Sequence, residues 1–375
     1  MASDATAQPL VLLEPGRTFA AEDIVFYAGR GERSLDDALA SADVLVSCPH
    51  SGAAIPGELE PFLVPEFTRR LQFDYTDCST SPIVRRWAEI DDSIVYVENP
   101  HPRLVRDPNR ARPDDLAATL SEALRRVREA GPFQPVDLSG VDAIRPVTFS
   151  FFPMLRVPET EAELHDLVEV FVEAGSRGVD VYQRTREELI ERMVALAFEG
   201  AGRSHHVTAL SFHDTMNTTT TRDGAVNVAR DPKDRLPQVV ALSNRGDHAG
   251  DPRPDDPRVT MDPERLRLLA HAFRTGFEVA HADDVALNQP YLGSQEIISS
   301  GSRFAELTAQ ASAAGVSLDA VQAEFLRELL LGAANAAHIH RPGTDWPEPD
   351  PDHVDAMARA CQRTFAAYRD ALASR

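Results

Sequence analysis

The chain has 375 residues, of which 43% are hydrophobic and 26% are charged, so its composition is that of an ordinary globular protein with a sizeable core. Its formal net charge of −21 at pH 7 argues against nucleic acid or an anionic membrane as a partner, because both attract clustered basic residues. No run approaches the roughly 18 apolar residues of a membrane helix, and residues 1–17 lack the pattern of a secretory signal, so we expect a cytoplasmic protein.

Short apolar runs alternate with helical segments along the chain, which is typical of an α/β sheet. Residues 43–48 predict a buried strand that ends just before His50. A helix is expected over 82–89 and a second strand over 94–98. Residues 114–130 carry apolar side chains at helical spacing and predict the next helix.

The middle of the chain continues the alternation. A pair of helices is expected over 161–198, with breaks at Gly175 and Gly178, because glycine has a low helix propensity. Residues 206–212 predict a third strand, which again ends at a histidine, His213.

The last third of the chain begins with residues 222–258, which are rich in Asp, Pro, Gly and Arg and predict a long loop region. Loops of that length in a compact domain are usually functional or disordered. A helix is expected over 262–281, a strand over 317–325 and a final helix over 351–373. The chain has no internal repeat and no convincing linker, so we expect a single domain.

His50 and His213 both follow predicted strands directly. In open α/β sheets, ligands bind in the crevice beyond the carboxyl ends of the strands. A catalytic zinc ion takes three nitrogen or oxygen ligands and keeps one position open for water, so two such histidines and one acid would fit. Equally, each histidine could cap its strand by bonding to neighbouring backbone.

The run from Arg103 to Arg110 (RLVRDPNR) follows the strand at 94–98. The guanidinium group of arginine offers a planar fork of donors that matches a carboxylate. Two arginines beyond a strand end could hold a substrate carboxylate and polarise a scissile carbonyl. Taken alone, the run favours the alternative, a surface loop held by salt bridges.

Gln322 and Glu324 lie within the predicted strand 317–325, where alternation places both side chains on the same face. A glutamate within an apolar run needs a partner or a role, because burying an unpaired charge is costly. A general base beside a metal-bound water and a buried salt bridge explain Glu324 equally well.

These segments together resemble the N-formylglutamate amidohydrolase family. The family's main sequence marks and two weaker ones occur here in the order in which the family has them, from about residue 44 to 330. The two weaker marks are Leu236–Gly246 and Asn288–Gly293. Each motif is weak alone, whereas seven in the right order are a strong signal. The main marks are His50-Ser51-Gly52, Thr76-Asp77, the run from Arg103 to Arg110, the segment around His213, and Gln322 with Glu324.

The resemblance implies a fold like that of the zinc carboxypeptidases and aspartoacylase, with a mixed central sheet flanked by helices and one Zn²⁺ ion. Residues 41–375 would form the catalytic domain, and residues 1–40 would be an N-terminal extension packed on it. The implied reaction is the attack of metal-bound water on an N-formyl or other N-acyl group of a small amino acid, so the partner would be a small-molecule carboxylate substrate. The sequence leaves the oligomeric state open, a homo-oligomer included.

The resemblance also implies roles for single residues. His50 and His213 would be metal ligands, and Asp77 would be the carboxylate ligand, with Asp74 as the competing candidate. Arg103 would polarise the acyl carbonyl, while Glu324 would deprotonate the zinc-bound water and then protonate the departing amine. Three further residues would bind the substrate: Asn109, Arg110 and Gln322.

Some positions depart from the family pattern. Ser211 stands where the family often has aspartate, Gln183 stands where its P-Y-H motif has histidine, and Ser294 replaces the second glycine of a G-G pair. These departures put the substrate in doubt. Two alternatives therefore stay open: a carboxypeptidase-like or cell-wall amide hydrolase, and a family member that binds a small acid without catalysis.

Overall fold

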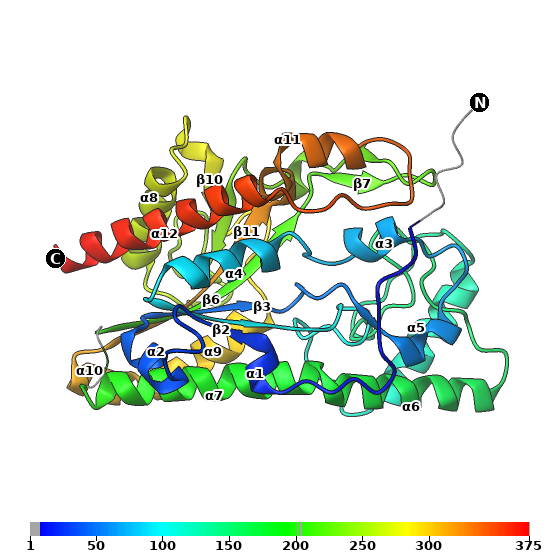
Figure 1. Ribbon diagram of the computed structural model, residues 1–375, viewed down its shortest axis with the longest axis horizontal. Coiled ribbons are helices and arrows are strands. Elements are labelled where there is room, and N and C mark those ends of the chain that lie inside the picture. Colours follow the sequence, from blue (N-terminus) through cyan, green and yellow to red (C-terminus); the bar gives the residue numbers. More distant parts are fainter. Residues whose placement is uncertain (1–7, 201, 203–204, 375) are drawn as a thin grey trace.

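The computed structural model describes residues 8–200, 202 and 205–374, and it shows a central sheet with helices on both faces (Figure 1). Within the described residues the sheet has seven strands. Neighbours β11, β6, β3 and β5 run parallel, while β9 pairs antiparallel with β11, and β2 pairs antiparallel with β5. The sheet is therefore mixed, as predicted. Its strands lie in the order β10 (Val285–Leu287), β9 (Val240–Ser243), β11 (Ser317–Leu326), β6 (His206–Thr215), β3 (Val44–Cys48), β5 (Ile94–Glu98) and β2 (Val25–Phe26).

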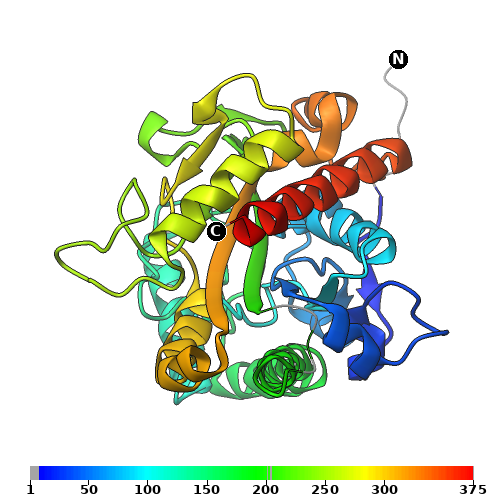
Figure 2. The ribbon, with the colours of Figure 1, turned by 90° about the vertical axis from the view of Figure 1, so that its left-hand side faces the viewer.

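The central strands are apolar over most of their length because both of their faces are covered. Val44 and Val46 belong to the core on one face, and Leu45 belongs to the core on the other. Figure 2 shows the layering, with α12 (red) and α8 (yellow-green) on one side of the strands and α7 (green, end-on) on the other. The first face is covered by α4 (Thr80–Ile90), α8 (Pro263–Gly276) and α12 (Pro351–Ala373), and the second by α2 (Leu35–Ser41), α7 (Val179–Phe198) and α9 (Gln295–Glu306).

A further apolar cluster lies beyond the carboxyl ends of β3 and β5, on the right in Figure 1. It includes Leu71, Leu120 and Phe171, and it supports the loops that follow those strands. Its elements are β1 (Leu12–Leu13), β4 (Ile55–Pro56), the 3-10 helix Gly57–Phe62, α3 (Arg69–Asp74), α5 (Leu116–Ala130) and α6 (Glu161–Arg177).

The remaining elements are short, apart from one helix that follows β11. Strands β7 and β8 pair as an antiparallel hairpin. Two short 3-10 helices cover Pro232–Asp234 and Ala282–Asp284. The others are α1 (Ala21–Ile24), β7 (Thr218–Thr220), β8 (Val226–Ala229), α10 (Thr308–Ala314) and α11 (Arg327–Ile339).

Several boundaries differ from the sequence prediction. The segment 222–258 is not one loop, because it contains β8 and the core strand β9. Gly175 lies inside α6, and only Gly178 breaks the helical pair, where a Cβ atom would lie 2.4 Å from the ring of His101. The helix predicted over 262–281 ends at Gly276. Strand β6 continues to Thr215, so His213 lies within the strand and not after it.

Residues before position 41 contribute β1, which pairs with β4, and β2, which forms one edge of the central sheet. Among the described residues, none of the helices combines the length and the apolar character that a membrane span requires.

Phe325 on β11 provides a test of the core. Its ring stacks on Phe212 with a centroid distance of 4.5 Å and contacts Phe273 and Phe277 at 5.8 and 5.6 Å. We expect Phe325→Ala to lower the free energy of unfolding by about 3–5 kcal/mol, because it leaves a cavity between these rings. Urea denaturation would measure the loss. Val228→Ala on the exposed hairpin is the control, and an equal effect of both changes would contradict the prediction.

Candidate active site

The candidate site lies at the carboxyl edge of the parallel strands β3, β5, β6 and β11. His50 follows β3, the loop from 99 to 115 follows β5, and His213 and Glu324 lie near the ends of β6 and β11. Since parallel strands end at one edge of a sheet, residues more than 100 positions apart in the chain meet there.

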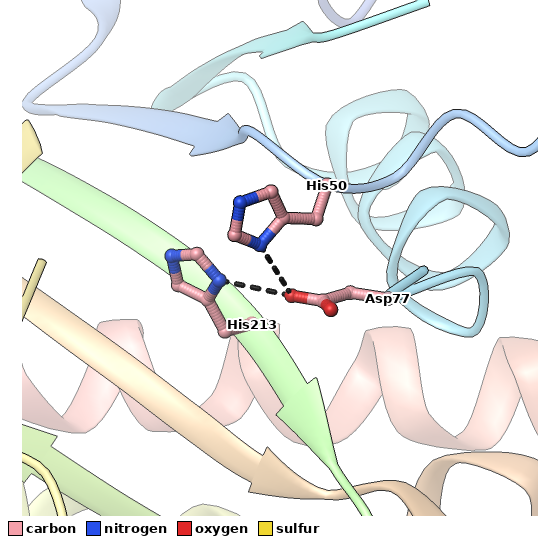
Figure 3. Close-up of side chains that lie close together, drawn as sticks. All are labelled: His50, Asp77 and His213. Atoms are coloured by element: carbon pink, nitrogen blue, oxygen red, sulfur yellow. Dashed lines mark hydrogen bonds and ion pairs between the residues drawn. The ribbon is translucent and has the colours of Figure 1, made fainter. Parts of the chain in front are cut away.

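Three side chains converge at this edge: His50, Asp77 and His213 (Figure 3). One carboxylate oxygen of Asp77, Oδ2, lies 3.3 Å from Nδ1 of His50 and 2.9 Å from Nδ1 of His213. All three residues are buried, and one ligand atom from each lies within 4.8 Å of the others. Two imidazole nitrogens and a carboxylate oxygen form a donor set that could hold a metal ion.

Local backbone contacts bring Asp77 to His50. Asp77 lies in the turn between α3 and α4, and its backbone N–H donates to the carbonyl of His50 over 2.9 Å. The glycine of the H-S-G motif is required by close packing, because a Cβ atom on Gly52 would lie 2.5 Å from the backbone of Pro100. The motif therefore joins the loops after β3 and β5.

Neighbouring charges and hydrogen bonds shift the pKa values of Asp77 and His213. Burial acts to raise the pKa of Asp77, but the neighbouring His50 and His213 outweigh it and hold that pKa below its ordinary value. Burial acts to lower the pKa of His213, but the hydrogen bond to Asp77 and the Glu324 charge raise it to about 8. Asp77 is therefore ionised and can act as a ligand.

Asp107 lies behind His50 and connects three groups. Its Oδ1 atom accepts from Nε2 of His50 over 2.7 Å and from the backbone N–H of Asn109 over 2.8 Å. Its Oδ2 atom accepts from Nη2 of Arg103 over 2.5 Å and from Nε over 3.2 Å. The second nitrogen of His50 is thus held by a carboxylate, which is common for metal-binding histidines.

Glu324 lies beside His213, which is its partner in the parallel register of β11 and β6. The carboxylate is buried and is oriented by two donors: Thr215 Oγ1 donates to Oε1 over 2.6 Å, and Gln322 Nε2 donates to Oε2 over 2.8 Å. The predicted same-face arrangement of Gln322 and Glu324 is confirmed.

A cleft of about 660 Å³ opens over these groups, and all the residues assigned to the site from the sequence line it. Arg110 also forms an ion pair with Asp142, with Nε donating over 2.6 Å, so part of its guanidinium is committed to the protein. The residues assigned from the sequence that line the cleft are His50, Asp77, Arg103, Asn109, Arg110, His213, Gln322 and Glu324.

Asp74, the competing carboxylate, also lines the cleft but is held elsewhere. Thr220 Oγ1 donates to its Oδ2 over 2.5 Å, and Arg327 Nη1 lies 3.7 Å from its Oδ1. The group of side chains suited to a metal contains Asp77 instead.

The sequence did not single out two arginines of the site. Arg327 is buried, pairs with Asp214 and donates to the carbonyls of Asp74 and Thr76 over 2.9 and 2.6 Å. Arg230 lines the cleft and donates from Nη1 to the hydroxyl of Tyr291 over 2.9 Å. The position of Arg327 directly after an apolar strand could have indicated that it belongs to the site. Arg230 lies in the segment that the sequence predicts as a loop, where no pattern distinguishes it from the other arginines.

The chain is similar to known proteins both in sequence and in structure. Residues 42–331 match the family described as N-formylglutamate amidohydrolase. A crystal structure of N-formylglutamate amidohydrolase from Ralstonia eutropha JMP134 is similar at 19% identity and a TM-score of 0.49, covering 88% of this chain and 95% of that chain. No protein among the curated sequences matches the chain.

Asp107→Asn tests the support behind His50. The change keeps the shape of the side chain but removes the charge that holds His50 and Arg103, so we expect metal affinity to fall about 10–100-fold. Competition with a chelator would measure it. Asp180→Asn is the control, because Asp180 pairs with Arg106 of the same loop. Equal metal affinity in Asp107→Asn and wild type would contradict the prediction.

Proposed function

Because the chain belongs to the N-formylglutamate amidohydrolase family, we propose that it is a zinc-dependent hydrolase that removes an N-formyl or other N-acyl group from a small amino acid. The observation that carries the proposal is the meeting of a His-Asp-His group and a buried, oriented glutamate in one cleft. We assign the catalytic domain to residues 41–375 and treat residues 1–40 as an N-terminal extension, whose described part adds the edge strand β2 to the central sheet.

The donor set of His50, Asp77 and His213 fits zinc. Imidazole nitrogens and one carboxylate are usual zinc ligands, and three protein ligands leave a position for water. Both histidines present Nδ1 to Asp77, and Nε2 of His50 is held by Asp107. When bound, zinc would act as a Lewis acid that lowers the pKa of a water to about 7 and polarises a carbonyl.

Glu324 is the proposed general base and acid. It would accept a proton from the attacking water and then deliver it to the nitrogen of the departing amine. Its position supports this role, because the hydrogen bonds from Thr215 and Gln322 fix the carboxylate at the cleft wall beside His213.

Arg103 is the proposed oxyanion group. Two of its nitrogens donate to Asp107, which fixes the direction of the guanidinium. The guanidinium carbon lies 4.7 Å from the centre of the Phe149 ring. A preset cation at the cleft would stabilise the negative charge that develops on the acyl oxygen, typically by about 3 kcal/mol.

Three side chains are proposed to bind the substrate carboxylate and amide: Asn109, Arg110 and Gln322. The side-chain oxygens of Asn109 and Gln322 are buried and have no hydrogen-bond partner among the described residues. Buried polar atoms are normally satisfied, so these two oxygens suit donors on a substrate, such as the amide N–H. Arg110 would supply charge for the carboxylate.

Metal content provides the first test. We expect about one zinc ion per chain in the purified protein and a loss of zinc in His213→Ala, because two ligands bind zinc far less tightly than three. Atomic absorption would measure both proteins. No metal in either protein after zinc is supplied would mean that the histidines are structural.

Glu324→Gln tests the chemistry. The change keeps the hydrogen-bonding shape but removes the proton acceptor, so we expect kcat for an N-acyl amino acid to fall by at least ~100-fold while zinc stays bound. Release of formate or another acid from a panel of N-acyl amino acids would be followed together with zinc content. Full activity in this variant would refute the mechanism, and a zinc-bound wild type without any activity would favour a binding protein.

A further inference from the structure

A second buried carboxylate, Glu296 at the start of α9, lies close to the metal-binding group. Ser47 Oγ and Ser211 Oγ donate to its Oε2 atom over 2.8 and 2.7 Å. Tyr182 donates to its Oε1 atom over 2.5 Å, and Nε of Arg186 lies 3.5 Å from the same oxygen. The carboxylate therefore receives three hydrogen bonds and one close cation.

These contacts keep Glu296 charged. Burial acts to raise its pKa, but the Arg186 charge and the hydrogen bonds from Tyr182 and Ser211 outweigh burial and hold that pKa below its ordinary value. An ionised carboxylate only accepts hydrogen bonds, so every hydrogen between Glu296 and its partners belongs to the partner.

The direction of the hydrogen bonds then follows from Ser211. Its hydroxyl has a single hydrogen, and that hydrogen is donated to Glu296. The Ser211 oxygen also lies 2.9 Å from Nε2 of His213, so it must accept from Nε2–H. Nδ1 is the atom that faces Asp77, so a metal ion that displaces the proton between them would find the Nδ1 lone pair, while Nε2 keeps its hydrogen.

Asn109 is the other group that faces Nε2 of His213, with its amide nitrogen at 3.3 Å. An amide N–H cannot satisfy a ring N–H, and the distance is longer than that to Ser211. Ser211 is therefore the acceptor that orients the ring.

We propose that Ser211 and Glu296 act together as the positioning group of His213, by fixing its tautomer and ring orientation for metal binding. The proposal rests on the proposed metal site. It gives the two histidines matching supports: His50 is held by the carboxylate of Asp107 directly, and His213 is held by the carboxylate of Glu296 through one hydroxyl. Outer partners of this kind typically affect metal affinity 10–100-fold.

The proposed role of Ser211 explains one departure of this sequence from the family pattern. Ser211 is the position at which the chain departs from the aspartate of the family pattern. Glu296 comes from a different element, α9, and reaches the same histidine from there. The departure therefore does not by itself argue for a protein that has lost catalysis.

The test compares zinc affinity in Ser211→Ala, Glu296→Gln and Ser47→Ala by chelator competition at one fixed pH. Ser47→Ala is the matched control, since Ser47 donates to the same oxygen of Glu296 as Ser211 does. We expect the first two variants to bind zinc about 10–100-fold more weakly and the control to stay within about threefold. The absorption spectrum of the cobalt-substituted protein should change in the same two variants only.

A double variant provides the rescue. Ser211→Asp should bind zinc poorly in the wild-type background, because two carboxylates would then face each other, but well together with Glu296→Gln. Equal affinity of wild type and Ser211→Ala, or an equal loss in Ser47→Ala, would overturn the positioning role. Ser211→Ala decides the question if Glu296→Gln fails to fold. A wild-type protein that binds no zinc would instead overturn the proposed metal site.

Discussion

The site depends on the burial of charge, and the carboxylate of Asp107 shows this most directly. A buried carboxylate is costly unless hydrogen bonds and opposite charges surround it. Asp107 obtains both from His50, from Arg103 and from the backbone of its own loop. The loops after β3 and β5 are consequently joined at one point, and a histidine and an arginine are oriented by the same anion.

Arg327 has the complementary role, since here a buried cation gathers acceptors. It joins the end of β11 to Asp214 on β6 and to the turn that carries Asp77, through the carbonyls of Asp74 and Thr76. Glu296 repeats the pattern of Asp107 on the side of α9. Each of these charged side chains connects elements that are distant in the sequence.

Much of this arrangement could be predicted from the sequence. Apolar runs with both faces buried identified β3, β5, β6 and β11, and residues near their carboxyl ends supplied the histidines and Glu324. The short strand β9 has only four residues and no periodicity, so the sequence around it predicts only a loop. The pairing of Arg110 with Asp142 and the approach of Glu296 to Ser211 depend on tertiary contacts, 32 and 85 residues apart, that no local pattern contains.

The register of β11 against β6 has a consequence for how such a protein can change. Gln322 and Glu324 face the cleft, while Ala323 and Phe325 belong to the core. A shift by one residue would exchange these two sets, so an insertion or deletion in this strand would damage packing and chemistry together. New substrate preferences would therefore have to arise in loops around the cleft that carry none of the proposed catalytic groups, such as 230–234, where length and side chains can vary without moving the sheet.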